Sequence, residues 1–531
     1  MNIKYFNVTI FALVAFLSTG FSQDTLLINW SSAPGHLEQT IMNDGEQHDV
    51  YILQADKVYL QRTKINTDRS IAIIGEVPSE GQHPATIQPF PNDDGSPGFI
   101  GWPTVNVEAQ GENIEVLLRN LLLNGAAVDG SFSIGGVVAA RGVEEKIIID
   151  HCVITNYEYV QMLALGISTD FHFTNSVSKS NSAQPGQQFW GGLLWGGGSW
   201  MGTMDTVIIQ NSSIMNMTGE AVVIYSQVDY GLIDQCTFAN ITCSAVWYRG
   251  QNNLTVKNNL LLNTRAHGQS VFDINSWGVW QPGGNGTMSL MTQPSPEWGE
   301  DGYYDEYGNI VQANFDPSNR NISWHNNVWW NQQALTDFMQ SSPWQWEQTD
   351  DYGETYTYHD TMLALEHQNK WIDDSTESVI NSGVGVDEWS NINSDPGINL
   401  AGAYLDRQLE RTWDFRENGG QMDYEPFTSK WWQYNNDGDP YNEEWPIHED
   451  WSYDPNTDAA TANENGGPVG AGPFGFHDFF YDGDDDDNEG GDCESEIEGY
   501  TYIGSLNNSC YYRSTTQMRW ASAIQQVQSL G

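Results

Sequence analysis

Between residues 117 and 331 one short pattern recurs, and it constrains the fold more than any other feature of the chain. In outline each copy reads apolar, polar, polar, small, any, apolar, any, Asn, and one copy has Ser in place of the final Asn. The copies end at Asn124, Asn156, Ser180, Asn216, Asn240, Asn263 and Asn331. The shortest spacings are 23 and 24 residues, and we interpret the longer ones as one such unit plus an insertion. Repetition at a fixed period predicts that each unit stacks on its neighbours.

These units have the pattern of short strands, because apolar and other residues alternate within them with a period of two. A unit of about two dozen residues that holds three short strands and adds roughly 4.8 Å of height is typical of a right-handed parallel β-helix. The sequence therefore predicts an all-β solenoid. Asn suits its corners, since Asn tolerates the left-handed conformation and its amide bonds the amides of the units above and below.

Small residues fill a second predicted column of the stack. Its members are Asn120, Cys152, Ser176, Ser212, Cys236, Asn259 and Asn327. Cys152 and Cys236 would lie three units apart, which is too far for a disulfide, so we expect buried thiols. Two other pairings of the five cysteines stay open, Cys236 with Cys243 and Cys493 with Cys510.

The chain before residue 117 carries less regular strand-like runs. They begin near Asp49, Lys57, Ser70 and Ala85 and are separated by turns. The preceding stretch 32–43 has the apolar spacing of a short helix, which we expect to cap the open end of the core.

This repeat resembles that of the pectate-lyase-like superfamily of right-handed parallel β-helix proteins, over roughly residues 30 to 400. The resemblance implies a β-helical body, which we assign to residues 24–400. The superfamily includes lyases, hydrolases, esterases, phage tailspikes and non-catalytic adhesins. It therefore implies a fold and leaves the activity open.

The two ends of the chain differ from this body in composition. Residues 1–23 have the weakly basic start and apolar run of a signal peptide, so we expect a secreted, extracellular or cell-surface protein. No later stretch predicts a membrane span. Residues 401–480 predict an irregular, aromatic-rich segment that packs on the β-helix, and residues 481–492 an acidic linker.

Residues 493–531 resemble the truncated start of a C-type lectin-like domain. The likeness rests on the strand-like run 499–512 and on the following Trp520-Ala-Ser-Ala. Val527 stands where that family usually has Cys, so the usual disulfide of this helix is absent. The sugar and Ca²⁺ ligands of the family would lie beyond Gly531.

A large negative charge limits the possible partners. The chain has 20 Lys and Arg against 70 Asp and Glu, a formal charge of -50. Such a field repels phosphates, which excludes nucleic acid and argues against anionic membranes. Screening by salt or divalent cations would relieve the self-repulsion, so Ca²⁺ is a candidate counter-ion, but no metal-binding motif and no cofactor is predicted.

The strand after the Asn corners supplies a candidate binding stripe. Tyr225, Arg249 and Asp273 recur every 24 residues, and Trp247 lies two positions before Arg249. Residues of the opposite face are Val222, Ile224, Val246 and Tyr248. The charges favour an outward stripe that holds an acidic sugar by ion pairing and aromatic stacking. The alternative interpretation is an exposed salt bridge with packing aromatics.

Further candidates flank this stripe. Trp277 and Trp280 lie in a long insertion, the part of a solenoid that commonly builds the binding face, and are candidate carbohydrate-binding residues. Arg265 and His267 lie in the adjoining turn. With Arg249 and Asp273, they are the candidate acid/base groups for a β-elimination.

Two functions follow from these features. The first is a non-catalytic glycan-binding or adhesion protein whose partner is a polysaccharide or surface glycan. The alternative is a carbohydrate-active enzyme, a polysaccharide lyase or glycoside hydrolase. No paired carboxylates, nucleophile elbow or Cys-His zinc spacing decides between them.

Overall fold

The computed structural model describes the following residues, together with a few single positions between them: 25–79, 81–99, 101–181, 191–196, 204–224, 228–241, 244–248, 253–264, 288–290, 321–335, 345–349, 355–359, 381–398, 452–472, 496–497, 500–506 and 509–514. The chain divides into two compact units, Met1–Phe480 and Tyr481–Gly531. Each unit is described by itself.

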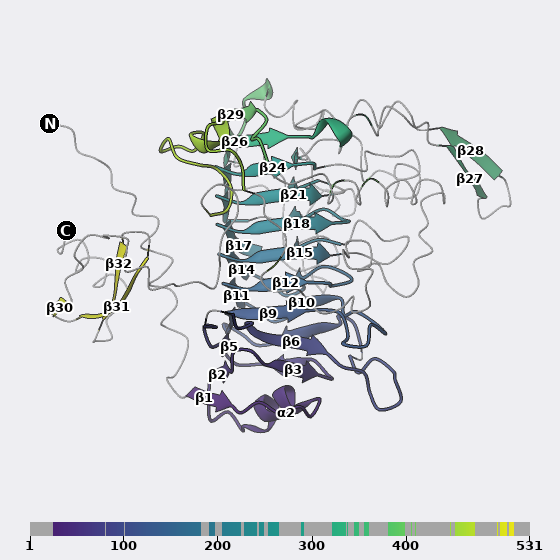
Figure 1. Ribbon diagram of the computed structural model, residues 1–531, viewed down its shortest axis with the longest axis vertical. Helices are drawn as coiled ribbons and strands as arrows, with labels where there is room; N and C mark the ends of the chain where they lie inside the picture. Colours follow the sequence, from purple (N-terminus) through teal and green to yellow (C-terminus); the bar gives the residue numbers. More distant parts are fainter. Residues whose placement is uncertain are drawn as a thin grey trace. The chain divides into compact units, whose positions relative to one another are not determined.

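The first unit is built mainly from two long parallel sheets (Figure 1). The larger contains β1 (Thr25–Ile28), β2 (Val50–Leu53), β3 (Val58–Gln61), β5 (Ile71–Gly75), β6 (Ala85–Pro89), β8 (Glu115–Arg119), β9 (Leu121–Asn124), β11 (Lys146–Asp150), β12 (Val153–Thr155), β14 (Thr169–Thr174), β15 (Val177–Asn181), β17 (Met204–Gln210), β18 (Ser213–Met217), β20 (Tyr230–Asp234), β21 (Thr237–Ile241), β23 (Asn253–Lys257), β24 (Leu260–Leu262), β26 (Asn321–Trp330) and β29 (Val386–Asn393). The smaller contains β4 (Ile65–Thr67), β7 (Val105–Ala109), β10 (Gly136–Ala140), β13 (Met162–Ala164), β16 (Leu194–Gly196), β19 (Val222–Ile224), β22 (Val246–Tyr248) and β25 (Met288–Leu290). A separate antiparallel hairpin joins β27 (Gln345–Thr349) to β28 (Thr355–His359).

Three stacks of strands grow together along the chain. Between β7 and β24, each further stretch of chain adds one strand to the stack of β7, one to that of β8 and one to that of β9. Ile209 pairs with Ile233, which pairs in turn with Val256, so the predicted repeat sets the register. The protein is thus all-β with long parallel sheets, as the sequence predicts.

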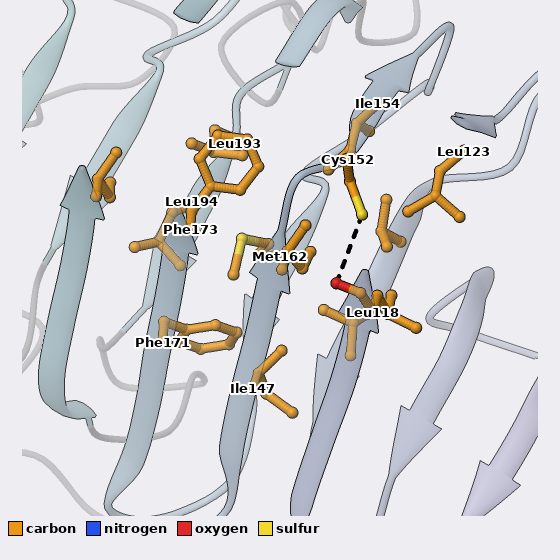
Figure 2. Packing of buried hydrophobic residues seen from close by; sticks show 14 of the residues in the cluster. Leu118, Leu123, Ile147, Cys152, Ile154, Met162, Phe171, Phe173, Leu193 and Leu194 are labelled. Carbon is orange, nitrogen blue, oxygen red and sulfur yellow. Dashed lines mark hydrogen bonds between the residues drawn. The ribbon is translucent and has the colours of Figure 1, made fainter. Parts of the chain in front are cut away.

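The main core lies between these stacks and is filled by the inward positions of the alternating strands. Ile147, Phe171 and Val207 follow one another in one inward row, and Figure 2 shows Ile147 and Phe171 beside Met162 from the smaller sheet. These side chains are at most 1% exposed. Burying each contributes about 1.5–3 kcal/mol, so the core supplies most of the stabilisation.

Left-handed corner residues confirm the predicted stacking. Asn216, Asn240 and Asn263 have φ values of 55, 52 and 49°. The Asn240 amide donates to Asn216 Oδ1 at 3.2 Å, and the Asn263 amide donates to Asn240 Oδ1 at 3.1 Å. The three side chains therefore form the expected amide ladder.

The first unit of the repeat was placed one residue out of register by the sequence pattern. Thr155 pairs with Asn124, so Asn156 lies opposite Gly125 and not opposite Asn124. A side chain at Gly125 would put its Cβ 2.7 Å from the ring of Tyr157, so glycine is needed at this position. The predicted amide contact is still formed, because the Asn156 amide donates to Asn124 Oδ1 at 3.2 Å. The same shift moves Asn120 out of the predicted small-residue column and into the row of His151.

The rest of that column is confirmed. The backbone N–H of Cys152 donates to Ser176 Oγ at 3.0 Å, and that of Cys236 donates to Asn259 Oδ1 at 2.8 Å. Both cysteines are buried free thiols, as predicted, so the bridge from Cys236 to Cys243 is not formed. Figure 2 shows the Cys152 thiol directed at the carbonyl oxygen of Leu118, 3.5 Å away. Burial is the main cause that raises the pKa of both thiols.

One end of the stack is covered by a short helix. The predicted helix is α2 (His36–Asn43), which begins after Gly35 in the left-handed conformation, φ 85°. Leu37 and Ile41 are buried in the main core cluster. The Glu38 carboxylate accepts hydrogen bonds from the backbone N–H groups of Arg62 and Thr63, which follow β3. The helix therefore closes the open edge at β3 and β4.

Residues 452–472, which we call the strap, lie along the outer face of the larger sheet. The strap contains the 3-10 helix η7 (Asp458–Ala460). Its side chains Tyr453, Ala459 and Val469 belong to one apolar cluster with two outer rows of the sheet. One row contains Leu122, Val153, Val177, Leu260 and Val328, and the other contains Met215, Ala239 and Leu262. The strap belongs to the predicted irregular segment 401–480, of whose other residues the structure describes only single positions.

The second unit has a small antiparallel sheet of β30 (Glu496–Ile497), β31 (Tyr500–Leu506) and β32 (Ser509–Ser514). The run 499–512, interpreted from sequence as one opening strand, is therefore a hairpin in which Cys510 belongs to β32. Three further predictions lie outside the described residues. They are the helix expected after the hairpin, Cys493 as the possible disulfide partner of Cys510, and the signal peptide. Among the residues that the structure describes, no helix is long and apolar enough to span a membrane.

Candidate functional site

Most of the predicted stripe lies outside the described residues. This applies to Tyr225, Arg249, Arg265, His267, Asp273, Trp277 and Trp280. Their roles remain predictions, and Trp247 on β22 is the member that the structure places.

Trp247 faces away from the main core, as the strand alternation predicts. Its neighbours Val246 and Tyr248 belong to the core cluster, whereas Trp247 continues an outer row through Val223 and Trp195. Trp247 is only 5% exposed and packs in a second apolar cluster with these two residues. Trp247 is therefore a packing aromatic residue in the structure, as the alternative interpretation of the stripe expected.

A second aromatic site, which the sequence analysis did not identify, lies further toward the amino terminus. Trp102 belongs to the loop between β6 and β7 and is 52% exposed. Three charged side chains surround its loop: Lys64 just before β4, Glu108 on β7 and Arg141 just after β10. We call Lys64, Trp102, Glu108 and Arg141 the Trp102 platform.

The stacking of three strands brings the charged groups together. Asn66, Glu108 and Ala139 occupy one outward row, because β7 pairs with β4 on one side and with β10 on the other. Lys64 and Arg141 flank this row at the ends of their strands. Glu108 therefore points outward between two cations that are far from it in sequence.

Glu108 holds both cations. Arg141 Nε lies 2.6 Å from Glu108 Oε1, and Lys64 Nζ is hydrogen bonded to Glu108 Oε2. Gln110 Nε2 donates to Glu108 Oε1 at 2.8 Å. The Glu108 side chain is 4% exposed, and the buried carboxylate is tolerable because Gln110 and Lys64 donate to its two oxygens and Arg141 adds an ion pair.

The same cations fix the loop that carries the indole. Arg141 Nη2 donates to the carbonyl oxygen of Trp102 at 2.9 Å, and Lys64 Nζ donates to that of Pro103 at 3.4 Å. The Arg141 guanidinium also lies over the indole, with Cζ 5.5 Å from the ring centroid. An exposed aromatic surface is thus held in a set position by a cation–π contact and two backbone hydrogen bonds.

Sequence reasoning missed this site because Lys64, Trp102 and Glu108 come from the less regular units before residue 117. Those units have no Asn corners, so no register could be assigned between these residues and Arg141. A usable signal was present, because Lys64 and Arg141 directly flank strand-like runs in a chain with few basic residues. Trp102 follows a Gly-rich turn in the loop between two such runs.

A second polar cluster centres on Asp150 at the end of β11. Arg119 Nε and His151 Nδ1 each lie 3.1 Å from Asp150 Oδ2, and the Thr174 hydroxyl donates to Asp150 Oδ1 at 2.7 Å. Burial opposes ionisation of Asp150 most strongly, but His151, Arg119 and Thr174 together outweigh it and lower the pKa to about 2. This carboxylate stays charged and orients its neighbours.

Carboxylates also gather near the starts of the strands of the larger sheet, where Asp170 belongs to β14 and Asp205 to β17. Burial, followed by the charges of Asp229, Asp170 and Glu144, raises the pKa of Asp205. In the described part of the chain, no group of three or more His, Cys, Asp or Glu side chains has an arrangement that would hold a metal ion.

Comparison with known proteins gives no family for this chain. No family model matches the sequence, and no curated protein matches it either.

Proposed function

We propose that this chain is a secreted glycan-binding protein built on a right-handed parallel β-helix of the pectate-lyase-like kind. The stacked parallel strands, the left-handed Asn corners and the capping helix α2 support this architecture. The lectin-like start after residue 493 supports a role in recognition. Secretion follows from the predicted signal peptide.

The observation that carries the binding function is the half-exposed Trp102. A Trp side chain offers a ligand a large apolar ring together with a polar N–H group that can reach water. Trp is also among the residues that most often dominate the energy of binding interfaces. Trp102 is held by Arg141 and Lys64 through its own loop, so little conformational freedom is lost on binding. A sugar ring can stack on such an indole.

A carbohydrate-active enzyme remains the second candidate. The observation that favours it is the pair of basic side chains, Lys64 and Arg141, beside a carboxylate and an exposed indole. A β-elimination needs a basic group together with a cation near the substrate carboxylate. Both cations are engaged by Glu108, which supports a binding role over proton transfer.

The test uses the full chain with a panel of uronic-acid and neutral polysaccharides in the presence of Ca²⁺. We expect retention of the protein on at least one polysaccharide in affinity electrophoresis, loss of retention in Trp102→Ala, and no new reducing ends or unsaturated products. Product formation that disappears in Arg141→Ala would establish the enzyme instead. No retention on any member would reject glycan binding.

A further inference from the structure

We infer that the strap carries a self-modification site: Asn465, which is followed by Gly466, deamidates spontaneously to aspartate and isoaspartate, and this change weakens the attachment of the strap to the larger sheet. The reaction consumes water and releases ammonia. It is independent of the proposed glycan binding, because neither residue belongs to the Trp102 platform.

The chemistry needs an asparagine whose side-chain carbon can be reached by the next backbone nitrogen. The Gly466 nitrogen loses its proton and attacks Cγ of Asn465, so a new C–N bond closes a succinimide ring. The bond from Cγ to Nδ2 then breaks, and the amide nitrogen leaves as ammonia. Water opens the ring at either of its carbonyls. One opening gives aspartate at position 465, and the other gives isoaspartate, in which the main chain runs through Cγ.

The strap turn, residues 463–468, places both reacting groups at the surface. Asn465 and Gly466 are exposed, and Gly466 has a left-handed φ of 77°. A Cβ built on Gly466 would meet no heavy atom within 4 Å, so the attacking nitrogen lies beside open space. Glycine also has no side chain of its own to hinder the approach of its nitrogen to Cγ.

Asn463 holds this turn together. Its Oδ1 accepts hydrogen bonds from the N–H groups of Asn465 and Gly467 at 2.8 and 2.7 Å. Its carbonyl oxygen accepts one from the N–H of Gly466 at 2.9 Å, and this bond has to open before the nitrogen can attack. A turn at the surface opens at a low free-energy cost, so the bond slows the reaction without preventing it.

A second Asn-Gly pair in the same protein supplies the contrast. Asn124 is 1% exposed, and its Oδ1 accepts hydrogen bonds from Ala126 N–H at 3.1 Å and from the Asn156 amide at 3.2 Å. A Cβ on Gly125 would lie 2.7 Å from the ring of Tyr157, so this pair is crowded. Asn124 can therefore react only after a larger opening of the stack.

Modification at position 465 acts on the strap where it is attached to the sheet. The preceding residue, Glu464, donates its backbone N–H to Asn258 Oδ1 at 3.1 Å and forms an ion pair with Lys257 at 2.7 Å. Isoaspartate adds a carbon to the main chain between these contacts and the next one, the Pro468 carbonyl that Gln235 binds. The new carboxylate also places a second negative charge beside Glu464. Both changes disfavour the attached strap.

The experiment ages the full chain at neutral and at mildly alkaline pH and follows each Asn-Gly peptide by mass spectrometry, with enzymatic methylation to detect isoaspartate. We expect position 465 to convert at least about tenfold faster than position 124, because an exposed turn opens more often than the core. We expect the rate to rise about tenfold per pH unit, since only the deprotonated nitrogen attacks. Equal rates at the two positions, or no conversion at position 465, overturn the site.

Asn465→Gln is the matched control, because glutamine keeps the amide but has to close a larger and less favourable ring. Limited proteolysis within residues 452–472 should be faster in aged than in fresh wild-type protein, and unchanged by ageing in Asn465→Gln. Conversion at position 465 without faster cleavage overturns the effect on the strap. Equal acceleration in the wild type and in Asn465→Gln assigns the loosening to another residue and overturns it too.

Discussion

At the scale of single residues, His172 is the clearest case of a side chain whose neighbours change its chemistry. It lies in an outward row of β14 between Ile148 and Ile208 of the adjacent strands. Burial, followed by the positive charge of Lys146, lowers the pKa of His172 to about 3. The folded protein therefore keeps this imidazole neutral far below the pH at which an exposed histidine becomes charged.

The first prediction concerns acid stability. Because the folded pKa of His172 is below that of the unfolded chain, its contribution to stability is present above pH 6.5 and is lost as the pH falls toward 3. His172→Gln should remove this loss, which is about 2 kcal/mol at pH 4 after allowing for partial exposure. Urea unfolding at pH 7 and pH 4 measures the difference. An equal pH dependence in both proteins would contradict the lowered pKa.

The second prediction separates backbone from side chain at an Asn corner. Asn240 is fully buried, has φ 52°, and both donates and accepts in the amide ladder. Asn240→Ala should cost about 2–4 kcal/mol, because it leaves two buried polar groups unpaired and because alanine tolerates the left-handed region less well than asparagine. Asn240→Gly loses the same bonds without the backbone penalty.

The glycine variant should therefore be more stable than the alanine variant by about 1 kcal/mol. Chemical unfolding of both proteins gives the comparison. If the two variants lose the same free energy, the corner is held by its amide bonds and the backbone conformation contributes little.

At the scale of elements, the strap shows how distant chain segments stabilise the stack. It binds a row of left-handed corner residues from successive units, namely Asn211, Gln235, Asn258 and Asn326. Gln235 Nε2 donates to the carbonyl oxygens of Pro468 and Gly470 at 2.7 and 3.0 Å. Lys257 lies 2.7 Å from Glu464, so one ion pair adds to these bonds.

The third prediction tests this attachment. Gln235→Ala removes two hydrogen bonds to the strap and should cost about 1–3 kcal/mol of local stability. Limited proteolysis within residues 452–472 should then become faster while the parallel sheets stay folded. Asn120→Ala is the control, because Asn120 has the same left-handed conformation but lies in the same row beside His151, three units before Asn211. Equal cleavage in the two variants would mean that Gln235 does not hold the strap.

At the scale of the whole molecule, charge opposes the compact state. A net charge of -50 is spread over 531 residues, and the described basic side chains are mostly engaged in local ion pairs such as Lys64 with Glu108 and Arg69 with Asp49. Those pairs satisfy individual carboxylates without removing the long-range repulsion. The stacked apolar core has to outweigh that repulsion.

The fourth prediction follows from this balance. Raising NaCl from about 10 mM to 300 mM shortens the Debye length from roughly 30 to 6 Å and should raise the midpoint of thermal unfolding by about 2–4 °C. Circular dichroism at neutral pH measures the shift. Repeating the titration with CaCl₂ at matched ionic strength separates screening from binding. A midpoint that falls or stays constant with salt would show that repulsion is not a significant cost.

The sequence alone determined the main pattern of the fold. A period of 23 or 24 residues, alternating apolar strands and Asn corners predicted the stacking of Asn216, Asn240 and Asn263, because each of these signals is local and repeats. It also predicted the buried thiols and the capping helix. The first unit is one residue out of register at Asn124, because Gly125 lies opposite the Asn156 corner, whereas the sequence pattern aligns Asn124 with it.

Only the tertiary structure decided which side chains meet at a surface. Sequence placed Trp247 on the outer face correctly, but its burial beside Trp195 depends on neighbouring strands that alternation does not describe. Likewise Lys64, Glu108 and Arg141 form one site because three strands from different units stand side by side. Register between strands sets such contacts, and register becomes readable from sequence only where the repeat is regular.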